Sequence, residues 1–132
     1  MPTPENKPWG WTVTQFADSK TEVKLCHIEK GGYSSVHRHN EKHNTFHVAQ
    51  GQLQVLEFSC DLEGITGVAI RLADKVHVLT PDSLPLVMPA GTIHQFYAPE
   101  KCVLIEVYHG AGESGFADPG DIERFTKHGR SG

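Results

Sequence analysis

The stretch GGYSSVHRHNEKHNTFHVAQG, residues 31–51, decides how this chain folds. Glycines at its two ends, Gly31 and Gly51, supply the backbone freedom that tight turns demand, so the residues between them are predicted to form two strands. His37 and His39 are separated by one residue on the first of these strands. Because side chains alternate between the two faces of a strand, both imidazoles point to the same side. Two neutral imidazoles on one face are suited to binding a divalent metal ion.

A second stretch, PAGTIH at residues 89–94, has a similar character. Pro89 fixes one backbone dihedral, Gly91 permits a reversal of the chain, and His94 then opens the next predicted strand. The sequence thus offers a third imidazole at the start of a strand, and manganese, iron, nickel and zinc are divalent ions that accept its neutral nitrogen.

Alternating apolar and polar runs recur about every ten residues along the chain, which is typical of a sandwich or barrel of strands. The strands expected from this pattern are residues 12–16, 22–28, 33–39, 44–49, 52–58, 68–72, 76–80, 84–88, 94–97 and 103–108. So many strands need a closed or two-sheet arrangement to cover their edges. The most apolar of them, residues 103–108, is expected near the centre of a sheet. The predicted fold class is all-β.

The two ends of the chain are expected to differ from this pattern. Residues 1–10 contain three prolines, which cannot pair continuously in a sheet, and are expected to form an N-terminal arm. Residues 119–127 carry acids in their first turn and a lysine near their end, which predicts a short helical turn. This turn lies in an expected C-terminal tail, residues 117–132. The length of the chain is close to the commonest domain size, so we expect a single domain over residues 1–132.

Composition and charge argue against several classes of function. The net charge is −4 and no run of Lys or Arg occurs, which does not fit a protein that binds nucleic acid through its phosphates. No apolar run reaches the roughly 18 residues that would span a bilayer, and residues 1–5 lack the features of a secretory signal. We therefore expect a cytoplasmic protein that binds neither nucleic acid nor membranes. Cys26, Cys60 and Cys102 are widely spaced, which predicts reduced and buried thiols.

The two histidine stretches resemble the paired motifs of the cupin superfamily, G-x5-H-x-H-x3or4-E-x6-G and G-x5-P-x-G-x2-H-x3-N. The residues that match these motifs are Gly31, His37, His39 and Gly51 in the first and Pro89, Gly91 and His94 in the second. The sequence departs from the motifs where Asn44 replaces the Glu, Ser83 the first Gly of the second motif, and Ala98 its final Asn. The resemblance implies a cupin double-stranded β-helix, also called a jelly-roll barrel, with one metal ion held by His37, His39 and His94.

The resemblance places the fourth ligand at Asn44, the position of the family's Glu. Asn44 would offer a neutral amide oxygen, so a complex with three neutral imidazoles would keep the full charge of the ion and be more Lewis-acidic. His43 is the alternative, but it faces the other way by strand parity and would reach the ion only if the strand carried a bulge. We therefore favour Asn44 as the fourth metal ligand.

A narrower resemblance covers most of the chain and is to the cupin domain of type II mannose-6-phosphate isomerases. Besides the two motifs, it rests on KPWG at residues 7–10, IEV at 105–107, DIERF at 121–125 and GR at 129–130. The pattern of that family has Gln at the position of His37 and Glu at that of Asn44. The resemblance implies a metal-dependent isomerase of a sugar or sugar phosphate, in which the ion polarises a carbonyl and its neighbouring hydroxyl while a base moves a proton.

Three functions stay open from the sequence. An isomerase needs a base and, for a phosphorylated substrate, a cation, whereas a site of three histidines can also hold iron(II) for a dioxygenase. The third function is a small-molecule-binding module without turnover. The candidate bases are Tyr33, Tyr97 and Glu106, and the candidate cations are Arg38, Lys42, Arg71, Lys75 and Arg124. The candidate apolar lining residues are Phe46, Val48, Leu86, Met88 and Phe96.

A homodimer is expected as well. Small barrels with edge strands and a proline-rich arm readily extend a sheet or exchange the arm across a two-fold axis. The partners predicted from the sequence are therefore a second copy of the chain and a small molecule, a sugar or sugar phosphate in the favoured reading.

Overall fold

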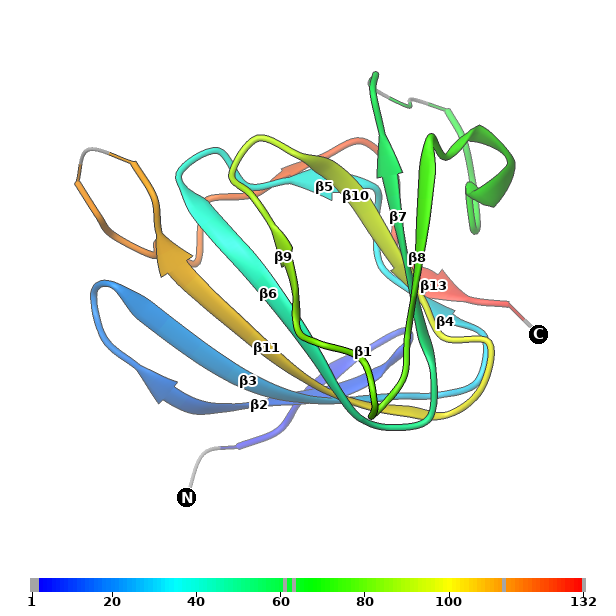
Figure 1. Ribbon diagram of the computed structural model, residues 1–132, viewed down its shortest axis with the longest axis horizontal. Helices are drawn as coiled ribbons and strands as arrows, with labels where there is room; N and C mark the ends of the chain where they lie inside the picture. The colour runs from blue at the N-terminus through cyan, green and yellow to red at the C-terminus, as the bar shows by residue number, and fades with distance from the viewer. Residues whose placement is uncertain (1–2, 61, 63, 113, 132) are drawn as a thin grey trace.

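The computed structural model describes residues 3–60, 62, 64–112 and 114–131. Strands dominate it, as Figure 1 shows. Their bounds are β1 Glu5–Lys7, β2 Gly10–Ala17, β3 Thr21–Ile28, β4 Gly32–Tyr33, β5 His37–Arg38, β6 Lys42–Gln50, β7 Leu53–Phe58, β8 Lys75–Leu79, β9 Leu86–Met88, β10 Ile93–Tyr97, β11 Cys102–Gly110, β12 Glu123–Arg124 and β13 Gly129–Arg130. Among the described residues the one helical element is the 3-10 turn η1, Ile70–Leu72. The all-β prediction is confirmed.

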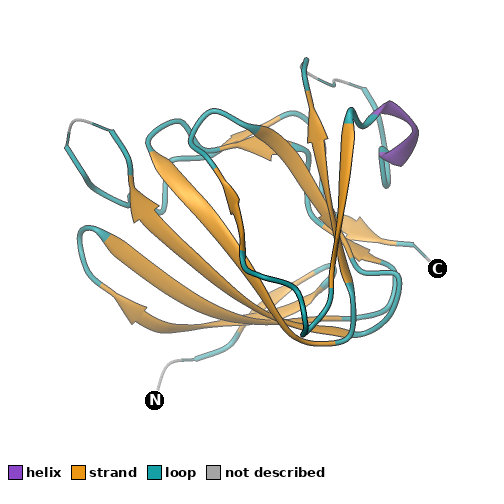
Figure 2. Ribbon diagram, viewed as in Figure 1, coloured by secondary structure: helices purple, strands orange, loops and turns teal. Residues whose placement is uncertain are grey.

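Two antiparallel sheets lie against each other (Figure 2). The first sheet has the order β1-β2-β3-β11-β6-β9. In the second sheet, β10 pairs with β7 on one side, where β8 follows, and with β4 and β5 on the other, where β13 and β12 follow. The strand predicted from its apolar character to be central is β11, and it lies between β3 and β6.

The long strands of the first sheet change character along their inner faces. One half of these faces is apolar and buried in the core, formed by Cys26, Ile28, Phe46, Val48, Cys102 and Leu104. The other half is polar and comprises Glu22, Lys24, Lys42, Asn44, Glu106 and Tyr108. The change from apolar to polar falls at matched positions in β11 and β3, where Leu104 pairs with Cys26 and Glu106 with Lys24. In β6 it falls one inward residue further along, because Glu106 pairs with Phe46. The interior therefore has an apolar core at one end and a polar pocket at the other.

The apolar core supplies the free energy of folding that compensates for the polar pocket at the other end of the interior. Phe46 and Leu104 are almost completely buried, and burying each such side chain contributes about 1.5–3 kcal/mol. A second apolar cluster covers the opposite face of the second sheet, where Val36, Leu56 and Ile93 pack under the loop that carries η1. The second sheet is thus covered by the pocket and core on one face and by this loop on the other.

The glycine turns expected at both ends of the deciding stretch are present. Gly31 has φ +85° and Gly51 has φ +80°, in the left-handed region that side chains with a Cβ rarely adopt. A Cβ at Gly31 would lie 2.2 Å from the carbonyl oxygen of Ser131, and one at Gly51 would lie 2.1 Å from that of Lys101. Both positions therefore require glycine for conformation and for space.

Two strand predictions need correction. The strand expected over residues 33–39 is split into β4 and β5, because Ser34 turns its side chain to the sheet and its hydroxyl accepts the N–H of Phe96 at 2.9 Å. The strand expected over residues 68–72 is wrong, since this segment forms η1. It leaves the sheet because the side-chain amide of Gln95 holds its backbone, with the amide N–H of Ala69 donating to Gln95 Oε1 at 3.0 Å.

The predictions for the two ends also need correction. Residues 119–127 form no helical turn. A turn at Pro119 and Gly120 leads instead into β12, which pairs with β5, so tertiary pairing overrides the local helical signal. The N-terminal arm is partly a strand, since β1 contains no proline and forms a hairpin with β2. Residues 1–2 of the predicted arm and residue 132 of the predicted tail lie outside the described residues.

The cysteines are free, as expected, but they differ in burial. Cys26 and Cys102 are buried, whereas Cys60 is exposed just beyond β7, so its predicted burial is wrong. Strand β7 ends at Phe58, so Cys60 lies outside the sheet. Within the described residues no helix combines the length and the apolar character needed to cross a membrane.

Candidate metal centre

Three histidines converge at the edge of the polar pocket. Two of them lie on adjoining strands, and the third follows one of these strands. His37 on β5 lies directly opposite His94 on β10 in the sheet register, and His39 follows β5. The ring of His37 lies 4.5 Å from that of His94 and 5.0 Å from that of His39, measured between centroids. One ring nitrogen from each of the three lies within 4.8 Å of the other two. The turn at residues 89–94 thus brings the third imidazole to the earlier pair.

Backbone carbonyls fix the orientation of all three rings. The Nδ1–H of His37 donates to the carbonyl oxygen of Ser35 at 2.8 Å, that of His39 to Asp121 at 2.8 Å, and that of His94 to Thr92 at 2.9 Å. A carbonyl only accepts hydrogen bonds, so the proton of each neutral ring is on Nδ1 and the lone pair is on Nε2. The Nε2 atoms of His39 and His94 are buried and have no hydrogen-bond partner among the described residues. This is the tautomer that metal-binding histidines use.

Burial keeps these imidazoles neutral at physiological pH. It lowers the pKa of His39 and of His94 to about 4, and the pKa of His37 well below its ordinary value. The neighbouring rings add to the effect, because a positive charge on one opposes a charge on the next. The donor set therefore fits a divalent metal ion of the kind that accepts neutral nitrogen.

The two alternatives for a fourth ligand lie on opposite faces of β6. Asn44 is 1% exposed and faces inward; its Nδ2 donates to Glu106 Oε2 at 3.1 Å, and its buried Oδ1 has no partner among the described residues. His43 faces outward, where its Nδ1 accepts the N–H of Ala90 at 3.0 Å. The register of β6 against β11 shifts only near Val103, far along the strand, so no bulge turns His43 inward. Asn44 remains the fourth ligand that we predict.

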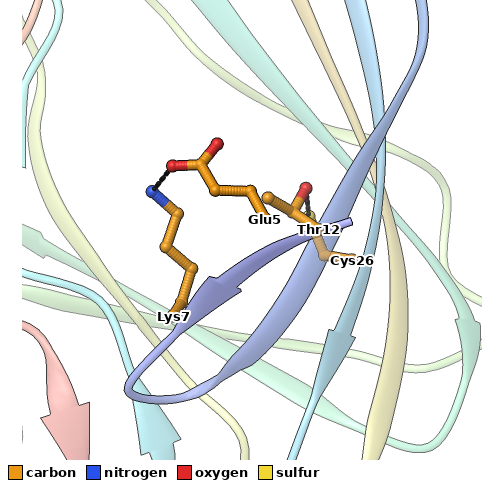
Figure 3. A network of polar contacts seen from close by, with 4 residues as sticks. All are labelled: Glu5, Lys7, Thr12 and Cys26. Carbon is orange, nitrogen blue, oxygen red and sulfur yellow. Dashed lines mark hydrogen bonds and ion pairs between the residues drawn. The ribbon is translucent and has the colours of Figure 1, made fainter. Parts of the chain in front are cut away.

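Glu106 lies on the inner face of β11 and lines the same pocket as His37 and His39. It accepts hydrogen bonds from the hydroxyl of Tyr108 at 2.5 Å and from the thiol of Cys26 at 3.5 Å, besides that from Asn44. Figure 3 shows that Cys26 is in turn held by Thr12, whose hydroxyl lies 3.3 Å from the sulfur. The carboxyl group is therefore fixed by side chains from three strands.

The surroundings shift the proton affinities of this network. Burial raises the pKa of Glu106, although the hydrogen bond from Tyr108 opposes the shift. Burial and then the charge of Glu106 raise the pKa values of Tyr108 and Cys26 well above their ordinary range. Tyr108 and Cys26 are accordingly neutral donors, and Cys26 is no thiolate nucleophile.

The pocket has a volume of about 130 Å³ and a charged lining. Of the cations proposed from the sequence, Lys42 and Arg124 line it. Lys42 is 3% exposed, its Nζ donates to the carbonyl oxygen of Asp118 at 2.9 Å and lies over the ring of Tyr108 at 4.5 Å, and burial lowers its pKa. Arg38 instead points away and pairs with Glu123 at 3.0 Å. The remaining candidates, Arg71 and Lys75, are exposed and do not line the pocket.

The other candidates divide in the same way. Of the three proposed bases only Glu106 lines the pocket; Tyr33 and Tyr97 face each other across β4 and β10 elsewhere. Of the proposed apolar lining only Phe96 reaches the pocket, while Phe46, Val48 and Met88 belong to the core.

Sequence reasoning missed several pocket residues, namely Lys7, Thr12, Glu22, Lys24, Cys26, Tyr108 and His128. The charged and polar residues at alternating positions in β3 and β11 were the available signal.

No family model matches this sequence, and no curated protein matches it. Solved structures do match. The capsular polysaccharide assembling protein CapF from Staphylococcus aureus is similar with a TM-score of 0.67 and 14% identity, over 96% of this chain and 34% of CapF. Streptomyces Pac13, solved with uridine, has a TM-score of 0.67 and 14% identity over 98% of this chain and 84% of Pac13. KdgF from Halomonas sp. has a TM-score of 0.64 and 17% identity over 85% of this chain and 89% of KdgF.

These neighbours are cupin-fold proteins. The chain has the cupin fold. It spans about a third of the length of CapF but most of the length of Pac13 and of KdgF. The cupin resemblance of the two motifs is thus confirmed for the fold, while the closer relation to type II mannose-6-phosphate isomerases stays a prediction. In the cupin barrel of this chain, the three histidines and Glu106 occupy the polar end of the interior.

Proposed function

We propose that this chain is a single cupin domain that binds one divalent metal ion and isomerises a small sugar or sugar phosphate. His37, His39 and His94 would hold the ion, and Asn44 would be the fourth ligand. The Nε2 atoms of His39 and His94 and the Oδ1 atom of Asn44 support this assignment, because they are buried without a partner in the described part of the chain and buried polar atoms normally have one. A bound ion of this kind would act as a Lewis acid toward the carbonyl and neighbouring hydroxyl of a sugar.

The observation that carries the catalytic part of the proposal is the placement of Glu106. Two buried carboxyl groups line the pocket together with His37 and His39, Glu22 at 9% and Glu106 at 4% exposure. Side chains on three strands hold Glu106 by hydrogen bonds. All three of its protein partners are donors, so its oxygens are held as acceptors. A buried carboxylate oriented by donors is suited to accepting a proton from carbon next to a carbonyl group.

In the proposed reaction Glu106 takes the proton from C2 of an aldose, and the C1 carbonyl becomes the hydroxyl of an enediol. Glu106 then returns the proton to C1, and the hydroxyl on C2 becomes the carbonyl of the ketose as its proton is lost. One proton has moved from C2 to C1 and one from O2 to O1, so no oxidant or reductant is needed. Tyr108 keeps the carboxylate in place through its hydrogen bond.

Exchange of carbon-bound hydrogen with solvent tests this proposal. The protein, stripped of metal and reloaded separately with Mn, Fe, Ni or Zn, is incubated in D2O with aldoses, ketoses and their phosphates, and deuterium at C1 and C2 is followed by NMR. We expect exchange with one metal and one sugar class, and loss of exchange in E106Q. E100Q is the matched control, because Glu100 is exposed and lies outside the pocket. Exchange that survives E106Q unchanged would contradict the assignment of the base.

A second candidate reaction is dehydration of a nucleoside. Pac13 is described as a nucleoside dehydratase and was solved with uridine, and its structure aligns with nearly the whole of this chain. Removal of a proton by Glu106 could equally be followed by loss of a neighbouring hydroxyl as water. Mass spectrometry separates the two reactions, because isomerisation leaves the substrate mass unchanged and dehydration lowers it by one water.

Two other functions are outcomes of the same experiments. Oxygen uptake by the iron-loaded protein would support the dioxygenase, and ligand binding without exchange, dehydration or oxygen uptake would support the non-catalytic module. The homodimer and the cytoplasmic location stay predictions from the sequence, and light scattering of the purified protein tests the first.

A further inference from the structure

The pocket carries a charge opposite in sign to that of the whole chain. Four of the chain's 12 Lys and Arg residues line it. Of the 16 Asp and Glu residues, 13 are described by the structure, and two of these line it. The chain as a whole has a net charge of −4. A cationic pocket in an anionic protein indicates a ligand that carries negative charge.

The cations of the pocket fall into an inner and an outer group. Lys24 and Lys42 lie on the inner faces of β3 and β6, and the carboxyl groups of Glu22 on β3 and Glu106 on β11 line the same pocket. The inner group is therefore balanced by two acids. The outer group, Lys7 on β1 and Arg124 on β12, holds the excess positive charge. His128 of the C-terminal segment lines the pocket as well, as a polar side chain.

Arg124 is placed next to the histidine cluster by strand pairing. On β12 it lies directly opposite His37, while its neighbour Glu123 lies opposite Arg38. Because side chains alternate on a strand, the Glu123–Arg38 ion pair occupies one face and Arg124 the other, where it lines the pocket. Within the described part of the chain Arg124 has neither an ion pair nor a hydrogen bond from its guanidinium group. Its five N–H donors are free for a ligand.

Lys7 and His128 line the same pocket as Arg124. Burial lowers the pKa of His128, and the positive charges of Lys7 and Arg124 lower it further, so both cations act on this imidazole. Figure 3 shows Lys7 reaching across to Glu5, with Nζ 2.7 Å from Oε1. Glu5 is largely exposed, so this ion pair is weak and can open to a competing anion.

We propose that Arg124, Lys7 and His128 form an anion subsite that binds a phosphate or carboxylate group of the substrate. The planar guanidinium group of Arg124 is suited to bidentate binding of either anion. Its position opposite His37 places the anion beside the histidine cluster, so the subsite would set which carbon of the substrate faces Glu106. The statement that the anion belongs to the substrate rests on the proposed function. The binding of an anion at this subsite can be tested without it.

Titration of the metal-free protein with inorganic phosphate, followed by NMR shifts of backbone amides, tests the subsite without any contribution from a metal. We expect shifts at residues 124 and 128–129 that saturate, and affinity weakened about fivefold or more in R124Q and in K7Q. R71Q is the matched control, because Arg71 is exposed and lies outside the pocket. Equal phosphate affinity in the protein and in R124Q would overturn the proposal, as would shifts centred elsewhere. Parallel titrations with acetate and sulfate distinguish a carboxylate from a doubly charged oxyanion.

The subsite and the proposed function can fail separately. If R124Q weakens phosphate binding but no sugar undergoes exchange in any metal-loaded form, the subsite stands and the isomerase is wrong. If exchange occurs with KM values for phosphorylated and neutral sugars that R124Q leaves unchanged, the isomerase stands and the subsite is wrong. We expect R124Q to raise KM for the anionic sugar about fivefold and to leave KM for the neutral sugar unchanged.

Discussion

Lowering the pH of the metal-free protein from about 7 to about 5 is expected to destabilise the fold through its buried histidines. The pKa of His94 is about 4 in the folded state because the ring is buried, against an ordinary value of 6.5. Between these two values the unfolded chain binds a proton that the folded chain excludes. The free energy of unfolding therefore falls with decreasing pH, by about 1.4 kcal/mol per unit for this residue. From pH 6.5 to 5 the loss is about 2 kcal/mol.

His39 has the same folded-state pKa and a similar expected contribution. The two together would remove about 4 kcal/mol by pH 5, a large part of the 5–15 kcal/mol that stabilises a typical domain. Glu106 acts in the opposite direction, since burial raises its pKa and protonation at low pH relieves the cost of a buried charge. The contribution of one histidine is therefore best measured as a difference between two proteins.

Urea unfolding of the EDTA-treated protein and of H94Q, at pH values between about 5 and 8, measures that difference. The glutamine does not titrate, so we expect the free energy of unfolding of H94Q to depend less on pH, by about 1.4 kcal/mol per unit below pH 6.5. Above pH 7 the difference between the two proteins should be constant, which serves as the internal control. Parallel curves across the whole pH range would refute the assignment of His94 as a buried neutral ring.

Replacing His94 with Ala should cut the metal content of the purified protein at least tenfold, measured by inductively coupled plasma mass spectrometry, whereas H109A, on the outer face of β11, should leave it unchanged. E106Q should retain the metal and lower the exchange rate about 100-fold or more, the usual contribution of a general base, so a loss of metal in this variant would point to a structural role instead. G51A should lower the free energy of unfolding by at least about 2 kcal/mol in urea titrations, because φ +80° and the carbonyl oxygen of Lys101 both exclude a Cβ; a smaller change would mean that the turn relaxes.

The residues themselves determined much of the fold. Alternation with a period of two predicted most of the long strands, and it placed His37 and His39 on one face and Asn44 and His43 on opposite faces. The glycines at 31 and 51 predicted turns that the left-handed backbone there confirms. These inferences held because strand geometry and the conformational freedom of glycine are local properties, which do not depend on distant parts of the chain.

Only the tertiary structure decided which side chains share the pocket. The pairing of β10 with β5 sets His94 opposite His37, and the pairing of β12 with β5 converts an expected helical turn into a strand that carries Arg124 to the same place. Lys7 reaches the pocket because β1 pairs with β2 despite the prolines around it. Such contacts depend on how two sheets close around a core, and closure is settled by hydrogen bonds and burial between residues far apart in sequence, which no local pattern encodes.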